Sequence, residues 1–103
     1  MAWILLLLAG VLEIVWAFYL KQSNGFTRLI PTLITLVTMA ASFALLSFSM
    51  RTLPLGTAYM VWTGIGAVGA FALGVLLLSE PLTTTRTLAA LMIVGGLALM
   101  KLS

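Results

Sequence analysis

The stretch Gly10-Val-Leu-Glu13-Ile-Val-Trp16-Ala17 places one carboxylate inside an apolar run. Glu13 is the only ionisable side chain between the N-terminus and Lys21. On insertion scales, an acid near the middle of a membrane-length helix costs about 2.5–3.5 kcal/mol. Because of this cost, an acid within a membrane-spanning segment indicates a functional site.

The composition around this stretch is that of a membrane protein. Of the 103 residues, 63% are hydrophobic and only 7% are charged, a balance typical of helices that cross a bilayer. The absence of Cys and His excludes thiol redox chemistry and zinc catalysis. We expect no cofactor, no metal and no enzymatic activity. Because the chain has no His, the group that would carry protons is a carboxylate. The five basic residues separate apolar runs and indicate headgroup anchors, not a nucleic-acid surface.

Four apolar segments are predicted to form an all-α membrane protein, with a single transmembrane domain over residues 1–103. The expected helices span about residues 3–20, 29–50, 57–78 and 84–102. A first helix of about 18 residues would rise about 27 Å, close to the thickness of the hydrocarbon core. Asn24-Gly25 is a strong turn signal in the first loop. Without a leading basic residue or an Ala-x-Ala-like cleavage site, we expect residues 1–20 to remain in the mature protein.

Small residues share a helical face with Glu13. Ala9 and Gly10 precede it by four and three positions, and Trp16 and Ala17 follow it by three and four, so all lie on one stripe. A stripe of small residues around one acid and one indole suits close contact with other helices.

The second and third segments carry further patterns. Four hydroxyls recur on one face of the second segment, at Thr35, Thr38, Ser42 and Ser49, and we expect this face to look into the protein. In the third segment Tyr59, Trp62, Thr63 and Gly66 share a face. The glycines Gly64, Gly66 and Gly69 crowd the middle of that segment, where they favour close packing and an easy place to bend.

The last segment has a face without polar atoms, formed by Ala89, Met92, Ile93 and Gly96. Such a face suits pairing with another helix better than contact with a substrate.

The loop charges are nearly balanced between the two membrane faces. Four spans place Arg51 and Lys101 on one side and Lys21, Arg28 and Arg86 on the other. The positive-inside rule barely chooses an orientation from two charges against three. The chain could therefore insert both ways.

These features resemble the small multidrug resistance family of bacterial proton-coupled exporters over the whole chain. The resemblance rests on four spans, the acid in the first, and Gly56-Thr-Ala-Tyr-Met-Val-Trp62 in the third. Glu13-Ile-Val-Trp16-Ala17, Trp62-Thr-Gly-Ile-Gly-Ala-Val-Gly69 and the ending Lys101-Leu-Ser look like the guanidinium-exporter subtype. A multidrug exporter of quaternary ammonium or polyaromatic cations is the alternative within the family.

The resemblance implies an antiparallel, dual-topology homodimer in the bacterial inner membrane, which agrees with the balanced loop charges. It implies that Glu13 is the shared site for protons and guanidinium, with site roles for the residues Gly10, Trp16, Ser42, Tyr59 and Trp62. It also implies that the last helix makes the dimer contact. Protons and cation would compete for two paired Glu13 carboxylates.

Less specific interpretations stay open beside these. A membrane hydroxyl commonly bonds the carbonyl four residues before it; we expect this for Thr38 and a site role for Ser42. Tyr59 could serve the site or packing equally. From another functional class, the chain could be a non-transporting membrane subunit whose Glu13 pairs with a base of a partner protein.

Overall fold

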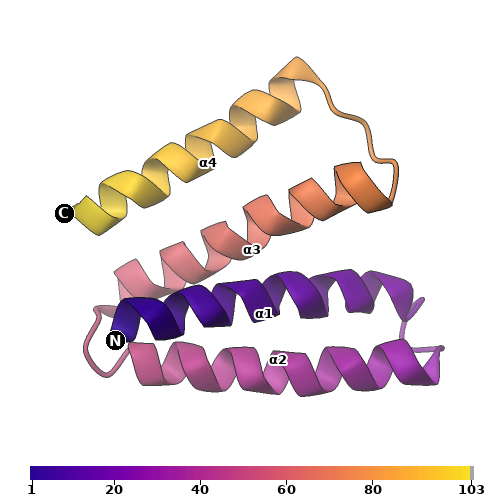
Figure 1. Cartoon of the computed structure of the whole chain (residues 1–103), viewed down its shortest axis with the longest axis horizontal. Coiled ribbons are helices and arrows are strands. Elements are labelled where there is room, and N and C mark those ends of the chain that lie inside the picture. Colours follow the sequence, from indigo (N-terminus) through magenta and orange to yellow (C-terminus); the bar gives the residue numbers. More distant parts are fainter. Residues whose placement is uncertain (103) are drawn as a thin grey trace.

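A computed structural model of the chain describes residues 1–102. In this range it has four helices, α1 (Ala2–Gln22), α2 (Leu29–Ser49), α3 (Leu55–Leu77) and α4 (Thr84–Leu102) (Figure 1). All four are long and apolar enough to cross a membrane, so the predicted all-helical membrane fold is confirmed. Ser103, which completes the Lys101-Leu-Ser ending, lies outside the described residues.

Local chemistry ends α1 and turns the chain. The Ser23 N–H donates to the Tyr19 carbonyl at 2.8 Å, and the Ser23 hydroxyl donates to the Leu20 carbonyl at 2.7 Å. Asn24 and Gly25 then take positive φ values of 50° and 71°, a conformation that these two residue types tolerate. The chain reverses here, at the predicted turn.

Proline and threonine set the starts of the last two helices. α3 begins directly after Pro54, whose φ of −61° is already helical, and the Ala58 N–H donates to the Pro54 carbonyl at 3.0 Å. The helix therefore starts slightly before residue 57. At α4, the Arg86 N–H donates to the Thr83 hydroxyl at 3.1 Å, as expected for an N-cap within the threonine run.

The four helices form a flat layer, 40 × 35 × 16 Å in its Cα extents. α1 packs against α2 and α3, whereas α4 packs mainly on α3 and lies at the edge of the layer (Figure 1). Both marked chain ends lie at one end of the layer, and the α1–α2 and α3–α4 loops lie at the other (Figure 1). The Lys101 ammonium nitrogen is 5.5 Å from the centre of the Trp3 ring, which places both residues at the same end.

The core is small and is shared by α1, α2 and α3. Its buried hydrophobic residues are Leu6, Ala9, Leu46, Ala58, Val61 and Trp62. Most other large apolar side chains are exposed, which suits helices whose surroundings are lipid tails and not water. α4 has no buried residue, so in one protomer it is held by one side only.

Candidate functional site

The Glu13 carboxylate of α1 lies directly against the backbone of α3 at Gly66. A Cβ atom at Gly66 would overlap the Cγ, Cδ and Oε1 atoms of Glu13. Only glycine leaves room for the acid here. Glu13 and Gly66, which the sequence placed on separate helices, are therefore in contact, and the backbone of α3 packs against the carboxylate.

Two polar atoms of this region are buried without a hydrogen-bond partner among the described residues: Oε1 of Glu13 and Nε1 of Trp16. Buried polar atoms are satisfied in the great majority of cases, so an orphaned acceptor and an orphaned donor need an explanation. Within residues 1–102, the one ion pair joins Arg86 to Glu80. No base neutralises Glu13, and its free oxygen can accept a proton or a cation.

Ser42 links all three core helices through hydrogen bonds. The Trp62 indole N–H of α3 donates to the Ser42 hydroxyl at 3.0 Å, and that hydroxyl donates to the Ala9 carbonyl of α1 at 2.7 Å. Ser42 is fully buried. The hydroxyl is saturated as donor and acceptor, which fixes the plane of the Trp62 ring.

The other hydroxyls of α2 behave differently. The Thr35 hydroxyl donates to the Pro31 carbonyl at 2.7 Å, and that of Thr38 to the Ile34 carbonyl at 2.7 Å. These are bonds within the helix, as expected for Thr38. Ser42 differs from them because its hydroxyl reaches across to another helix.

An aromatic row runs from Trp16 to Tyr59. The ring centres of Trp16 and Phe43 are 6.3 Å apart in an edge-on arrangement, those of Phe43 and Trp62 are 5.7 Å apart, and those of Trp62 and Tyr59 are 5.6 Å apart. Sequence reasoning missed Phe43, which joins the two tryptophans. A Phe in an apolar helix carries no distinguishing pattern, and its place next to Ser42 is no signal because adjacent residues of a helix point about 100° apart.

Two further predicted site residues lie around this row. Gly10 is buried, and a Cβ there would come 2.6 Å from Cγ2 of Ile65, so Gly10 brings α1 close to α3. Tyr59 is 53% exposed and contacts the site through the Trp62 ring. The structure thus collects Trp16, Trp62 and Ser42 around one row, with Tyr59 at its outer end.

The three glycines of α3 contact different neighbours. A Cβ at Gly64 would come 2.6 Å from Cδ2 of Leu97 on α4, and one at Gly69 would overlap Ile14 on α1. The helix is continuous from Leu55 to Leu77. These positions therefore serve close packing here, and bending stays a prediction.

The predicted pairing face of α4 is exposed in the protomer. Ala89, Met92, Ile93 and Gly96 are all exposed, Met92 at 76%. An added Cβ at Gly96 would meet no atom within 4 Å. This face has room for another helix, and its role in a dimer stays a prediction.

Known proteins are similar to this chain over most of its length. A family described as "Small Multidrug Resistance protein" matches residues 1–94. The chain is 57% identical over 103 residues to a guanidinium exporter of Citrobacter freundii, covering 100% of this chain and 98% of the relative. It is 54% identical to a guanidinium exporter of Yersinia pseudotuberculosis, covering 100% and 99%.

Proposed function

The chain belongs to the small multidrug resistance family, and from this premise we propose that it exports guanidinium from the bacterial cell in exchange for protons. It is a multi-pass protein of the inner membrane with four spanning helices. Its curated relatives carry the name guanidinium exporter, which supports a transporter without enzymatic activity.

The observation that carries the proposal is the orphaned Glu13 carboxylate. Its Oε1 is buried with no hydrogen-bond partner among residues 1–102, and it rests against Gly66. An unpaired acid inside a membrane protein is maintained at a cost only where it binds something. A proton or a cation can neutralise it, and because both use the same oxygens they exclude each other.

The surroundings of Glu13 match a small planar cation. Guanidinium presents N–H donors in a fork that fits a carboxylate and can stack on an aromatic face. Trp16 lies one turn from Glu13, with an indole N–H that has no hydrogen-bond partner among residues 1–102. Trp62 is held in a fixed plane by Ser42. Aromatic rings in fixed planes, together with a carboxylate, favour binding of a planar cation over a bulky one.

Exchange requires a second protomer in this proposal. An antiparallel pair would bring two Glu13 carboxylates into one cavity, with the exposed α4 face as the contact. If both acids must lose their protons before one cation binds, two protons enter for each guanidinium expelled. One net charge then moves inward per cycle, worth about 2.3 kcal/mol for each 100 mV of membrane potential.

Purified protein in liposomes tests this function directly. We expect a guanidinium-dependent electrogenic current that Glu13→Gln abolishes, with the variant still inserting as a four-helix protein by circular dichroism. A current that survives the substitution contradicts the mechanism. Competition by quaternary ammonium or polyaromatic cations at concentrations similar to guanidinium would instead identify the chain as a multidrug exporter.

A further inference from the structure

A second carboxylate and an aromatic ring line one cavity at the loop end of the molecule. The cavity has a volume of about 330 Å³ and is lined by α1, α3, the α3–α4 loop and the first turn of α4. Glu80, Arg86, Phe71 and Lys21 line it together with Ala17 and Ala67. Ala17 is one turn beyond Glu13, and Ala67 follows Gly66. The cavity thus extends from the loop charges to residues adjoining the seat of Glu13.

Glu80 is held in place by the end of α3. Its N–H donates to the Gly74 carbonyl at 3.0 Å, and a Cβ at Gly74 would overlap the Glu80 carboxylate. The side chain is nevertheless 38% exposed. The carboxylate is therefore positioned by the backbone and still reachable from outside.

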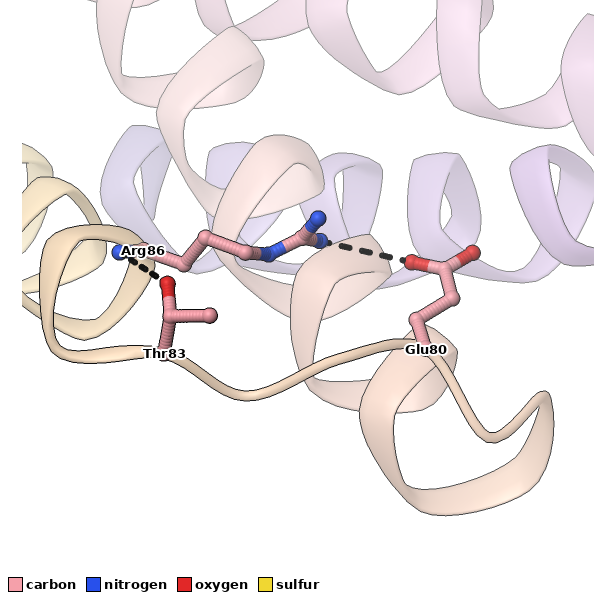
Figure 2. A network of polar contacts seen from close by, with 3 residues as sticks. All are labelled: Glu80, Thr83 and Arg86. Carbon is pink, nitrogen blue, oxygen red and sulfur yellow. Dashed lines mark hydrogen bonds and ion pairs between the residues drawn. The ribbon is translucent and has the colours of Figure 1, made fainter.

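The group facing Glu80 is the guanidinium of Arg86 (Figure 2). The distance from Nη2 of Arg86 to Oε1 of Glu80 is 3.5 Å, longer than the usual 2.7–2.9 Å of a charge-assisted hydrogen bond. Nε of Arg86 is buried without a partner among the described residues. The guanidinium carbon lies 5.3 Å from the centre of the Phe71 ring. The side chain stacks on the ring but does not form the two-pronged contact that its shape allows.

This arrangement repeats the chemistry of the proposed transport site. Trp16 follows Glu13 by one helical turn, and Phe71 lines the same cavity as Glu80. At Glu80 the site already holds a guanidinium, but one tethered to the chain. We propose that Glu80 and Phe71 form an outer binding site for the exported guanidinium, which competes there with the Arg86 side chain. The identity of the cargo rests on the proposed function.

The charges around the cavity set the strength of this outer site. Lys21 lines the same cavity and opposes a bound cation, and Arg86 is a competitor at high local concentration. A free guanidinium can align two N–H groups with both oxygens of Glu80, which the tethered one does not do. Binding is therefore weak, as suits a site where cargo is transferred and not stored.

Opposite effects of two substitutions distinguish this site from a structural ion pair. In liposomes, Glu80→Gln removes the acceptor and raises the half-saturating guanidinium concentration by about three- to fivefold, the scale of an exposed ion pair. Arg86→Gln removes the competitor and lowers that concentration. Arg51→Gln is the control, because Arg51 also lies over a ring, Phe48, at 5.5 Å but has no carboxylate beside it among the described residues.

The proposal would be overturned if Glu80→Gln and Arg86→Gln changed the half-saturating guanidinium concentration in the same direction. A purely structural ion pair is lost in either variant, so both substitutions would then have the same effect. Unchanged values in both would overturn it as well.

A binding measurement separates this proposal from the transport function. In the Glu13→Gln protein, guanidinium chloride should shift the amide resonances of Gly74 and Glu80 saturably, and equal sodium chloride should not. Adding Glu80→Gln should abolish the shift. A Glu13→Gln protein without a saturable shift rejects the outer site even if the wild type transports. A wild type that moves no guanidinium rejects the proposed function and leaves this titration to decide the outer site.

Discussion

Ser42 is the residue whose removal should affect both stability and binding. Its hydroxyl receives the Trp62 N–H and donates to the Ala9 carbonyl. In Ser42→Ala the buried indole N–H loses its acceptor, which costs about 1–3 kcal/mol. We expect a lower unfolding midpoint in detergent titration and a higher half-saturating guanidinium concentration, since the Trp62 ring is no longer fixed.

Ser49→Ala is the matched control for this prediction. Ser49 is equally buried, but its hydroxyl donates to the Leu46 carbonyl of its own helix at 2.7 Å. That carbonyl also accepts the Met50 N–H at 3.1 Å, so little is left unpaired. Equal loss of guanidinium affinity in the two variants would contradict the role given to Ser42.

Gly66 should be intolerant of even one methyl group. In Gly66→Ala the new Cβ occupies the space of the Glu13 carboxylate, and overpacking of this kind costs about 1–3 kcal/mol. We expect transport to be lost with insertion and folding largely retained. Glu13→Asp in the same chain withdraws the carboxylate by one methylene, so the double variant should recover part of the current that Gly66→Ala loses.

Gly56→Ala supplies the comparison on the same helix. An added Cβ at Gly56 meets no atom within 4 Å, and alanine favours a helix over glycine. Its transport should equal that of the wild type. A Gly66→Ala protein with normal transport, or one that Glu13→Asp fails to improve, would show that the carboxylate does not depend on this contact.

Individual residues differ in how far sequence could predict them. Glu13 stood out in the sequence because an acid inside an apolar helix is costly, and its role as the binding site stays a prediction. Thr38 followed the common rule for membrane hydroxyls, and it bonds its own helix. Phe43 was not predictable, because its place between Trp16 and Trp62 depends on how α2 is rotated against two other helices.

At the scale of helices, the glycines of α3 set its close contacts with α1 and α4. Gly64 faces Leu97 of α4, whereas Gly66 and Gly69 face Glu13 and Ile14 of α1. The glycine pattern predicted close packing in the middle of the helix. It could not assign each glycine to a neighbour, because that assignment follows from the relative position of three helices and not from spacing along one.

α4 should be the element that pairs protomers. Gly96 lies on its predicted pairing face and has open space around it, so Gly96→Leu leaves the protomer intact. In an antiparallel pair the added side chain would separate the helices. We expect the dimer dissociation constant to rise at least about tenfold, equivalent to about 1.4 kcal/mol, as measured by dilution with a fluorescent energy-transfer pair.

Gly95→Leu tests whether that effect belongs to one face. Gly95 is also exposed, and an added Cβ there meets no atom within 4 Å, but it points about 100° away from Gly96 around the helix. Its dimer should be close to that of the wild type. Equal weakening by both variants would assign the contact to the whole helix, and no weakening by Gly96→Leu would remove α4 from the interface.

For the whole molecule, sequence predicted the number of helices and which loops share an end. Both follow from segment length and an even number of spans, and the structure places the chain ends together (Figure 1). The position of α4 at the edge of the layer, where it packs mainly on α3, was not predictable. α4 has no buried residue, so its sequence does not indicate which of its faces packs against α3.

Orientation in the membrane is decided by charges at the two ends of the layer, and the final prediction addresses it. The chain has no Cys, so single cysteines report without background. Thr27→Cys and Thr52→Cys place one exposed thiol at each end. With two bases against three, the charge bias is too small to select one orientation. About half of each thiol should therefore react with a membrane-impermeant maleimide in intact cells, and the remainder only after permeabilisation.

The two cysteines check each other in this experiment. A chain that inserts one way labels one position fully and protects the other, so complementary extremes would contradict dual topology and with it the antiparallel pair. With Thr27→Cys as the reporter, Asn24→Lys and Thr52→Lys should then shift its labelled fraction in opposite directions, because each new charge favours the cytoplasm for its own end. Either variant alone would lack oppositely inserted partners and transport poorly, and co-expression of both should restore the guanidinium current.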